Sequence, residues 1–149
     1  MQLTSSAFEH GKRIPTKYTC DGENINPPLA ISDVPYQAQS LVLLMDDPDV
    51  PPTAPVRVWD HWVIFNIPPD TKTIEEGKNP SGVMGKNTRG DLFYGGPCPP
   101  DREHRYFFKL YALDTVLSLS DGPTKKEVEQ AMQEHVIAQT ELVGVYERI

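Results

Sequence analysis

The sequence predicts a mainly β fold, namely an antiparallel β-sandwich of Greek-key type with one helix in the C-terminal region and a small flank. Its apolar segments are short, rich in β-branched and aromatic residues, and follow one another without helical segments between them. Fifteen prolines are spread along the 149 residues, and proline is poorly tolerated inside helices. A chain of this length can bury a core of its own, so we expect residues 1–149 to form a single domain.

The strands are predicted from short apolar runs that end at proline, glycine or acidic residues. The segment 40–45 (SLVLLM) is continuously apolar, which indicates a strand buried on both faces. The segment 46–55, with four prolines and three acidic residues, is expected to be a loop. The expected strands, in chain order, are 2–8, 29–31, 40–45, 60–68, 105–113 and 141–147.

Two of these strands also predict which side chains share a face, because successive side chains of a strand point to opposite sides. In 105–113, one face is expected to carry Tyr106, Phe108, Leu110 and Ala112. In 60–68, one face is expected to carry His61, Val63, Phe65 and Ile67, and the other Trp62, Ile64 and Asn66.

One segment near the C-terminus predicts a helix. Thr124 and Glu127 have the spacing of a capping box, in which each residue bonds the backbone N–H of the other. The inner stripe of this helix is expected to contain Val128, Met132, then His135 or Val136, and Gln139.

The charge and the apolar content exclude several classes of partner. The net charge is −7, which argues against nucleic acid and against an acidic membrane surface, since both need clustered basic residues. The N-terminus has no apolar signal region, and no apolar run is long enough to span a bilayer, so a cytoplasmic location without integral membrane association is expected. In that setting Cys20 and Cys98 are expected to be free thiols, although a disulfide between them remains open.

Polar residues cluster where three predicted strands begin or end. These clusters are 46–51 (DDPDVP), 60–62 (DHW) and 104–106 (HRY), and a glycine- and proline-rich loop at 95–100 precedes the last. In this loop, the peptide bonds Cys98–Pro99 and Pro99–Pro100 are candidates for cis geometry. If the three strand ends meet at one edge, they bring carboxylates, imidazoles, a phenol and backbone amides together, which suits a small anion such as phosphate.

Simpler readings of these residues are also open. Asp-Pro-Asp is most often a solvated turn, and His61 and Tyr106 could be core residues. Arg105 is more readily paired with Asp47 or Asp49 than with a ligand. Two histidines and an aspartate could hold iron, but no HxH or HxxxH spacing is present, so we expect no metal and no cofactor. Acyl transfer is weaker still, because a GxSxG elbow is absent.

Nearly the whole chain resembles the phosphatidylethanolamine-binding protein family, and in particular its bacterial and archaeal Raf kinase inhibitor-like branch. The resemblance rests on four blocks in order: YTCDGENINPPLAIS, DDPDVP, DHWVIFNIP and YGGPCPPDREHRYFFKLYALD. It implies the β-sandwich, no settled catalytic activity, and a small pocket for an anion such as a phosphate or a phospholipid headgroup. Carried over by motif, the ligand-binding residues would be Asp47, His61, Gly96, Pro97, Pro99, His104 and Tyr106, with Asp49 and Arg105 as structural support.

The chain departs from the family pattern at one place. Residues 101–103 are Asp-Arg-Glu, where relatives usually have a glycine. Arg102 therefore adds a cation near the expected pocket mouth, where it could assist an anion or close the entrance.

Three functions are therefore considered for a monomer or homodimer. The first is an anion-binding module, in which acid should strengthen binding by protonating the imidazoles. The second is an inhibitor of a kinase or serine protease that acts through the surface loops 46–55 and 77–90. The third is a hydrolase or lyase with His61 or His104 as general base. We expect the first, a binding protein and not an enzyme.

Overall fold

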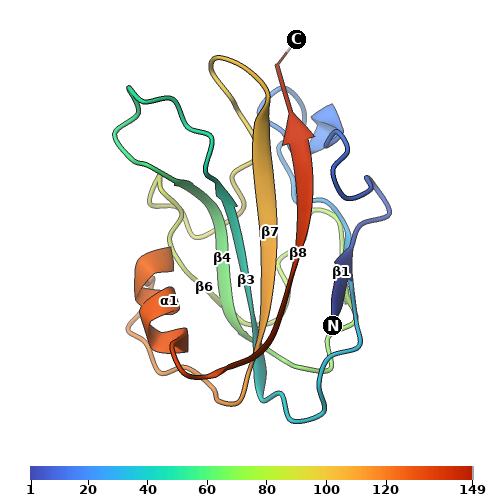
Figure 1. Cartoon of the computed structure of the whole chain (residues 1–149), viewed down its shortest axis with the longest axis vertical. Helices are drawn as coiled ribbons and strands as arrows, with labels where there is room; N and C mark the ends of the chain where they lie inside the picture. The colour runs from blue at the N-terminus through green and yellow to red at the C-terminus, as the bar shows by residue number, and fades with distance from the viewer. Residues whose placement is uncertain (149) are drawn as a thin grey trace.

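The computed structural model describes residues 1–148, which form two antiparallel sheets and one α-helix (Figure 1). The three-stranded sheet has the order β1-β2-β5, with β1 at Gln2–Thr4, β2 at Leu29–Ser32 and β5 at Thr73–Ile74. The five-stranded sheet has the order β6-β4-β3-β7-β8. Its strands are β3 (Ser40–Asp47), β4 (Trp59–Ile67), β6 (Val83–Met84), β7 (His104–Leu113) and β8 (Val136–Tyr146). The predicted mainly β class is confirmed, and the Greek-key connection stays a prediction.

The main core lies between the two sheets. Leu3, Ile31 and Ile74 of the small sheet belong to the same buried cluster as Leu43 and Trp62 of the large sheet. A second cluster covers the other face of the large sheet, where Val128 and Met132 of α1 (Lys125–Met132) pack with Val42 and Leu44. Strand β3 therefore lies between two apolar layers and is buried at all eight positions, as predicted for residues 40–45. Asp46 and Asp47 belong to this strand and not to the loop predicted at 46–55.

The predicted faces are right for β7 and only partly right for β4. Tyr106 and its partners at every second position are fully buried in the inter-sheet core. In β4, Val63 and Phe65 face the helix layer while Trp62 and Ile64 face the small sheet. Ile67 also joins the inter-sheet core, contrary to the prediction. Asn66 explains the change, because it has a φ of 54° at a register shift, which reverses the alternation after it.

The predicted capping box is present, but the helix is shorter than expected. Thr124 accepts from the backbone of Glu127, and the Glu127 side chain reaches back to the Thr124 backbone. The helix ends at Met132 and Glu134 follows with a φ of 69°, so His135, Val136 and Gln139 are not part of a helical stripe. Pairing of β8 with β7 along ten residue pairs stabilises an extended chain there instead.

Two features of the loops differ from the expectations. Cys20 and Cys98 form a disulfide with a Cα–Cα distance of 5.4 Å, so they are not free thiols. Disulfides are uncommon in reducing compartments, so the cytoplasmic location stays a prediction without support from this bond. Residues 1–148 contain no cis peptide bond, so Cys98–Pro99 and Pro99–Pro100 are trans.

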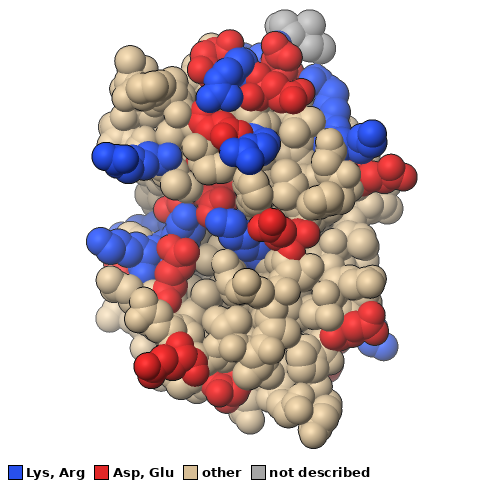
Figure 2. All heavy atoms as spheres, in the orientation of Figure 1, with Lys and Arg blue, Asp and Glu red and all other residues tan. Residues whose placement is uncertain are grey.

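The distribution of surface charge and the character of the helices relate to the predictions about nucleic acid and membranes. On the face drawn in Figure 2, acidic and basic side chains lie interspersed. Within residues 1–148, no helix combines the length and the apolar character that a membrane crossing requires.

A candidate anion site

A β-bulge sets the position of His61. Met45 pairs with Trp62 and Asp46 pairs with Asp60, so His61 is the extra residue of β4. Its ring makes an edge contact with Tyr106 of β7, with 5.3 Å between the ring centroids. Because Tyr106 belongs to the inter-sheet core, His61 lies on the face opposite Val63 and Phe65. The sequence placed it on the wrong face, since strict alternation cannot anticipate a bulge.

Two hydrogen bonds fix the ring of His61 to the glycine loop. The Gly95 N–H donates to the His61 carbonyl at 3.0 Å, and His61 Nδ1 lies 2.6 Å from the Gly95 carbonyl oxygen. A carbonyl can only accept, so Nδ1 carries the proton and, in the neutral ring, Nε2 is an acceptor. Nε2 has no hydrogen-bond partner among residues 1–148.

Burial keeps this ring neutral. His61 is 6% exposed, and removal from water lowers its pKa to about 4, against smaller contributions from the Gly95 hydrogen bond and from Asp46 that favour protonation. The expected attraction of anions to a protonated His61 therefore begins only near pH 4, so at neutral pH another group must supply the positive charge.

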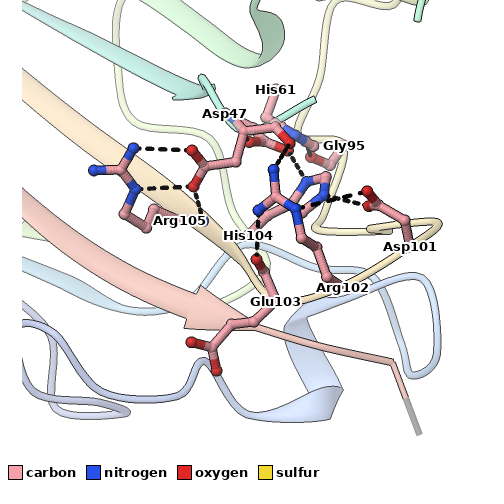
Figure 3. Close-up of polar contacts among 9 residues, drawn as sticks. Asp47, His61, Gly95, Asp101, Arg102, Glu103, His104 and Arg105 are labelled. Atoms are coloured by element: carbon pink, nitrogen blue, oxygen red, sulfur yellow. Dashed lines mark hydrogen bonds and ion pairs between the residues drawn. The ribbon is translucent and has the colours of Figure 1, made fainter. Parts of the chain in front are cut away.

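His104 is held very differently (Figure 3). Its Nδ1 lies 2.7 Å from Asp47 Oδ2, and its Nε2 lies 2.7 Å from Asp101 Oδ1. Asp47 also accepts the Asp49 N–H at 2.7 Å. Burial raises the pKa of Asp47, against the hydrogen bonds from His104 and the Asp49 backbone that lower it.

The support residues form the predicted ion pair. Arg105 binds Asp49 through Nε and Nη2, both at 2.9 Å, and this pairing lowers the pKa of Asp49 to about 2. Arg102 does not line the cavity described below, and its Nε lies 3.7 Å from Asp101 Oδ2. Its guanidinium donates to the carbonyls of Asp49 and Glu103, which ties the 101–103 turn to the loop after β3.

Tyr106 lies beside both histidine rings. Its centroid is 6.4 Å from that of His104, in a stacked arrangement, and its hydroxyl is buried without a hydrogen-bond partner among residues 1–148. Burial, with the negative charge of Asp47 nearby, raises the pKa of Tyr106 well above its usual value, so the phenol stays protonated. An unpaired buried O–H is costly, and such groups are found where a ligand or water completes them.

A cavity of about 190 Å³ opens next to His61. It brings together only two of the seven predicted ligand-binding residues, His61 and Gly96. The other five, Asp47, Pro97, Pro99, His104 and Tyr106, do not line it. The full lining is Cys20, Asn24, Trp59, Asp60, His61, Asn87, Arg89, Asp91, Phe93, Tyr94, Gly95, Gly96 and Cys98.

The glycine loop is a wall of this cavity and not a source of free donors. The Gly96 N–H donates to Asn24 Oδ1 at 2.8 Å, and the Gly95 N–H is used by His61. A Cβ on Gly96 would lie 2.3 Å from Asn24 Oδ1 and 2.4 Å from the Tyr18 carbonyl, so only glycine fits. The Cys20–Cys98 disulfide holds the glycine loop against the segment that contains Asn24. The Cys20 N–H, which donates to the Pro97 carbonyl at 3.1 Å, holds the same two segments together. The expected backbone anion nest is therefore wrong for these two amides.

Sequence reasoning missed Arg89, the cation of the cavity. It belongs to a turn built by Asn87, whose Oδ1 accepts the N–H groups of Arg89 and Asp91, both at 3.0 Å. The available signal was the NTRGD run at 87–91, since asparagine at the first and glycine at the fourth position favour a β-turn.

A metal centre is not supported by the geometry. Within residues 1–148, no group of three or more His, Cys, Asp or Glu side chains is arranged to hold a metal ion.

The comparisons with known proteins agree with this architecture. Residues 4–147 match the family model described as phosphatidylethanolamine-binding protein. A UPF0098 protein of Methanothermobacter thermautotrophicus is 54% identical, with 99% of each chain covered, and one of Chlamydia trachomatis is 51% identical with the same coverage. Among solved structures, a phosphatidylethanolamine-binding protein homologue of Chlamydia trachomatis has a TM-score of 0.96 at 50% identity, covering 99% of this chain and 97% of its own. YbcL of E. coli, described as a member of the mammalian family, has a TM-score of 0.89 at 32% identity, with coverages of 99% and 98%.

Proposed function

This chain belongs to the phosphatidylethanolamine-binding protein family, and we propose that it binds a small oxyanion, with the phosphate group of a headgroup or of free phosphate as the best fit. The observation that carries the proposal is the open Nε2 of His61, held at a small cavity that Arg89 also lines. A cavity of about 190 Å³ is smaller than the roughly 300–1,000 Å³ of drug-sized ligand sites, which favours a compact ligand.

Arg89 is the positive charge that would hold an anion at this cavity, and Asp91 is the carboxylate that opposes it. Lys125 engages Asp60 at 2.9 Å and Asp46 at 2.9 Å, so the Asp60 charge is already compensated. None of the ion pairs among residues 1–148 includes Arg89, so its guanidinium is available to a ligand. Guanidinium groups bind phosphate through paired hydrogen bonds. The kinase or protease inhibitor and the hydrolase or lyase remain alternatives, and the expectation that the protein is not an enzyme stays a prediction.

The test is a calorimetric titration of inorganic phosphate and phosphoethanolamine into wild type, His61→Ala and His135→Ala. His135 is half-exposed and pairs with Asp114, so its variant controls for loss of an imidazole elsewhere. We expect His61→Ala to weaken binding about tenfold or more and His135→Ala to leave it unchanged. Equal affinities in all three proteins would remove the proposal.

A further inference from the structure

Two hydrogen-bond acceptors, on His61 and Asp91, line the cavity beside the donors of Arg89. His61 Nε2 is an acceptor in the neutral ring, since Nδ1 donates to the Gly95 carbonyl. Asp91 adds a carboxylate to the lining, and Gly95 and Gly96 have no amide hydrogen to spare. A fully deprotonated anion would therefore meet lone pairs at His61 and Asp91.

Arg89 supplies the opposing positive charge from a fixed turn. Besides accepting from Arg89 and Asp91, Asn87 donates through its N–H to the Asp91 carbonyl at 2.9 Å and through Nδ2 to the Phe93 carbonyl at 3.1 Å. The Thr88 N–H donates to the Asp60 carbonyl at 3.0 Å, and Thr88 Oγ1 accepts the Asp60 N–H at 2.7 Å. The turn is thereby tied to β4 next to His61, so Arg89 and the imidazole belong to one rigid frame.

We infer that the site selects an oxyanion that carries a donor hydrogen, such as hydrogen phosphate, and rejects one that has none, such as sulfate. This inference rests on the proposed function and specifies its ligand. Arg89 binds the charged oxygens, and the P–OH hydrogen is donated to His61 Nε2. A site built to hydrogen-bond an O–H discriminates strongly against an analogue without it, because the ligand then covers the acceptor with a lone pair and leaves it unpaired.

The groups around His61 determine the pH range in which Nε2 is unprotonated and can accept a hydrogen bond. Asp60, Arg89 and Asp91 face the cavity, Asp46 lies on β3 and His104 on β7. Asp46 favours protonation of the imidazole, whereas Arg89, His104 and above all burial oppose it. Nε2 is therefore an acceptor over the whole neutral range and becomes a donor only in acid.

The main experiment is a ligand panel against the wild-type protein at pH 6 and pH 8. Inorganic phosphate retains a P–OH at both values, methyl phosphate loses its own as pH rises through about 6, and dimethyl phosphate and sulfate have none. We expect phosphate to bind at least tenfold tighter than sulfate and dimethyl phosphate at both pH values, and methyl phosphate to match phosphate only at pH 6.

A fifth ligand separates free phosphate from a lipid headgroup. Glycerophosphoethanolamine is a diester without a P–OH, but its ammonium group can donate. Affinity equal to that of phosphate would support the donor-hydrogen rule and identify the headgroup as the source. Affinity as weak as that of dimethyl phosphate would support the P–OH donor and free phosphate or a monoester.

Arg89→Gln tests the cation, with Arg57→Gln as the matched control. Both arginines are exposed on loops, but Arg57 lies in the segment 50–57 and does not line the cavity. Arg89→Gln should weaken phosphate binding about tenfold and Arg57→Gln should not change it. Equal affinity of wild type for sulfate and phosphate, or an Arg89→Gln variant that binds like wild type, would overturn the inference while leaving anion binding intact. Absence of binding by every ligand would remove the proposed function as well.

Discussion

Two of the four histidines, His61 and His104, lie beside the same tyrosine ring but have opposite surroundings. His61 is neutral, held through one nitrogen by a backbone carbonyl, and its other nitrogen is free next to a cavity. His104 has a carboxylate at each nitrogen and is 1% exposed. The resemblance treated both as ligand-binding residues, whereas the structure leaves only His61 accessible. The motif therefore predicts which residues lie close together. The hydrogen bonds within the protein then determine which ring nitrogens are left for a ligand.

Removal of Asp47 should have the largest effect on stability, because Asp47 is the buried partner of His104. Its side chain is 5% exposed and accepts from His104 and from the Asp49 backbone. Asp47→Ala leaves His104 with a buried unpaired donor and should cost about 3 kcal/mol in the free energy of unfolding, measured with urea. Asp101→Ala is the control, since this partner is 39% exposed and its removal should cost clearly less. Equal losses would show that the two carboxylates hold His104 alike.

Acid should destabilise the folded protein by protonating His61. Its pKa is about 4 in the folded chain and about 6.5 when unfolded, so the unfolded state binds more protons between these values. The stability that depends on a neutral His61 is complete above about pH 6.5 and is lost as pH falls through the folded pKa, a change of roughly 3 kcal/mol. Urea unfolding at pH 7, 5.5 and 4 measures it.

His61→Gln is the control for this pH dependence, because glutamine does not titrate. The difference in unfolding free energy between wild type and His61→Gln should shrink or reverse toward pH 4. Parallel pH profiles for the two proteins would mean that His61 is not held neutral by burial.

The smallest expected effect is on phosphate affinity, and it concerns Asp101, the hydrogen-bond partner of His104 Nε2. Asp101→Asn removes one negative charge from the group around His104, and we expect phosphate affinity to rise a few-fold because the neighbouring cavity becomes less negative. Glu103→Gln removes the same charge from an exposed position in the same turn, without a contact to His104. Calorimetry should show a larger gain for Asp101→Asn. Identical gains would reduce the effect to net charge alone.

The sequence predicted those parts of the fold that repeat. The continuous apolar run of β3, the alternation in β7 and the capping box of α1 all follow rules that apply residue by residue. The errors occur where one residue breaks a period. His61 and Asn66 sit at register shifts of β4, and Glu134 has a left-handed backbone that ends the helical stripe. Such interruptions depend on the neighbouring strand, which a single segment does not describe.

The sequence predicted several contacts around the site, but only two of the residues that line its cavity, His61 and Gly96. The Arg105–Asp49 pair and the gathering of His61, His104 and Tyr106 follow from polar residues at strand ends that meet. The saturation of the Gly96 amide by Asn24, the Asp101 contact and the placement of Arg89 depend on loops whose partners are more than 70 residues apart or on turn geometry. The Cys20–Cys98 bond belongs to the same class, because docking of two loops brings the sulfurs together.

The claim that one imidazole is open and the other closed is tested most directly by following the ring nitrogens of both histidines by NMR at pH 7 while phosphate is added. We expect His61 Nε2 to shift from a free acceptor toward a hydrogen-bonded one, with both nitrogens of His104 unchanged. A shift at His104 Nε2, with His61 unaffected, would contradict the account and place the anion where Asp101 now lies.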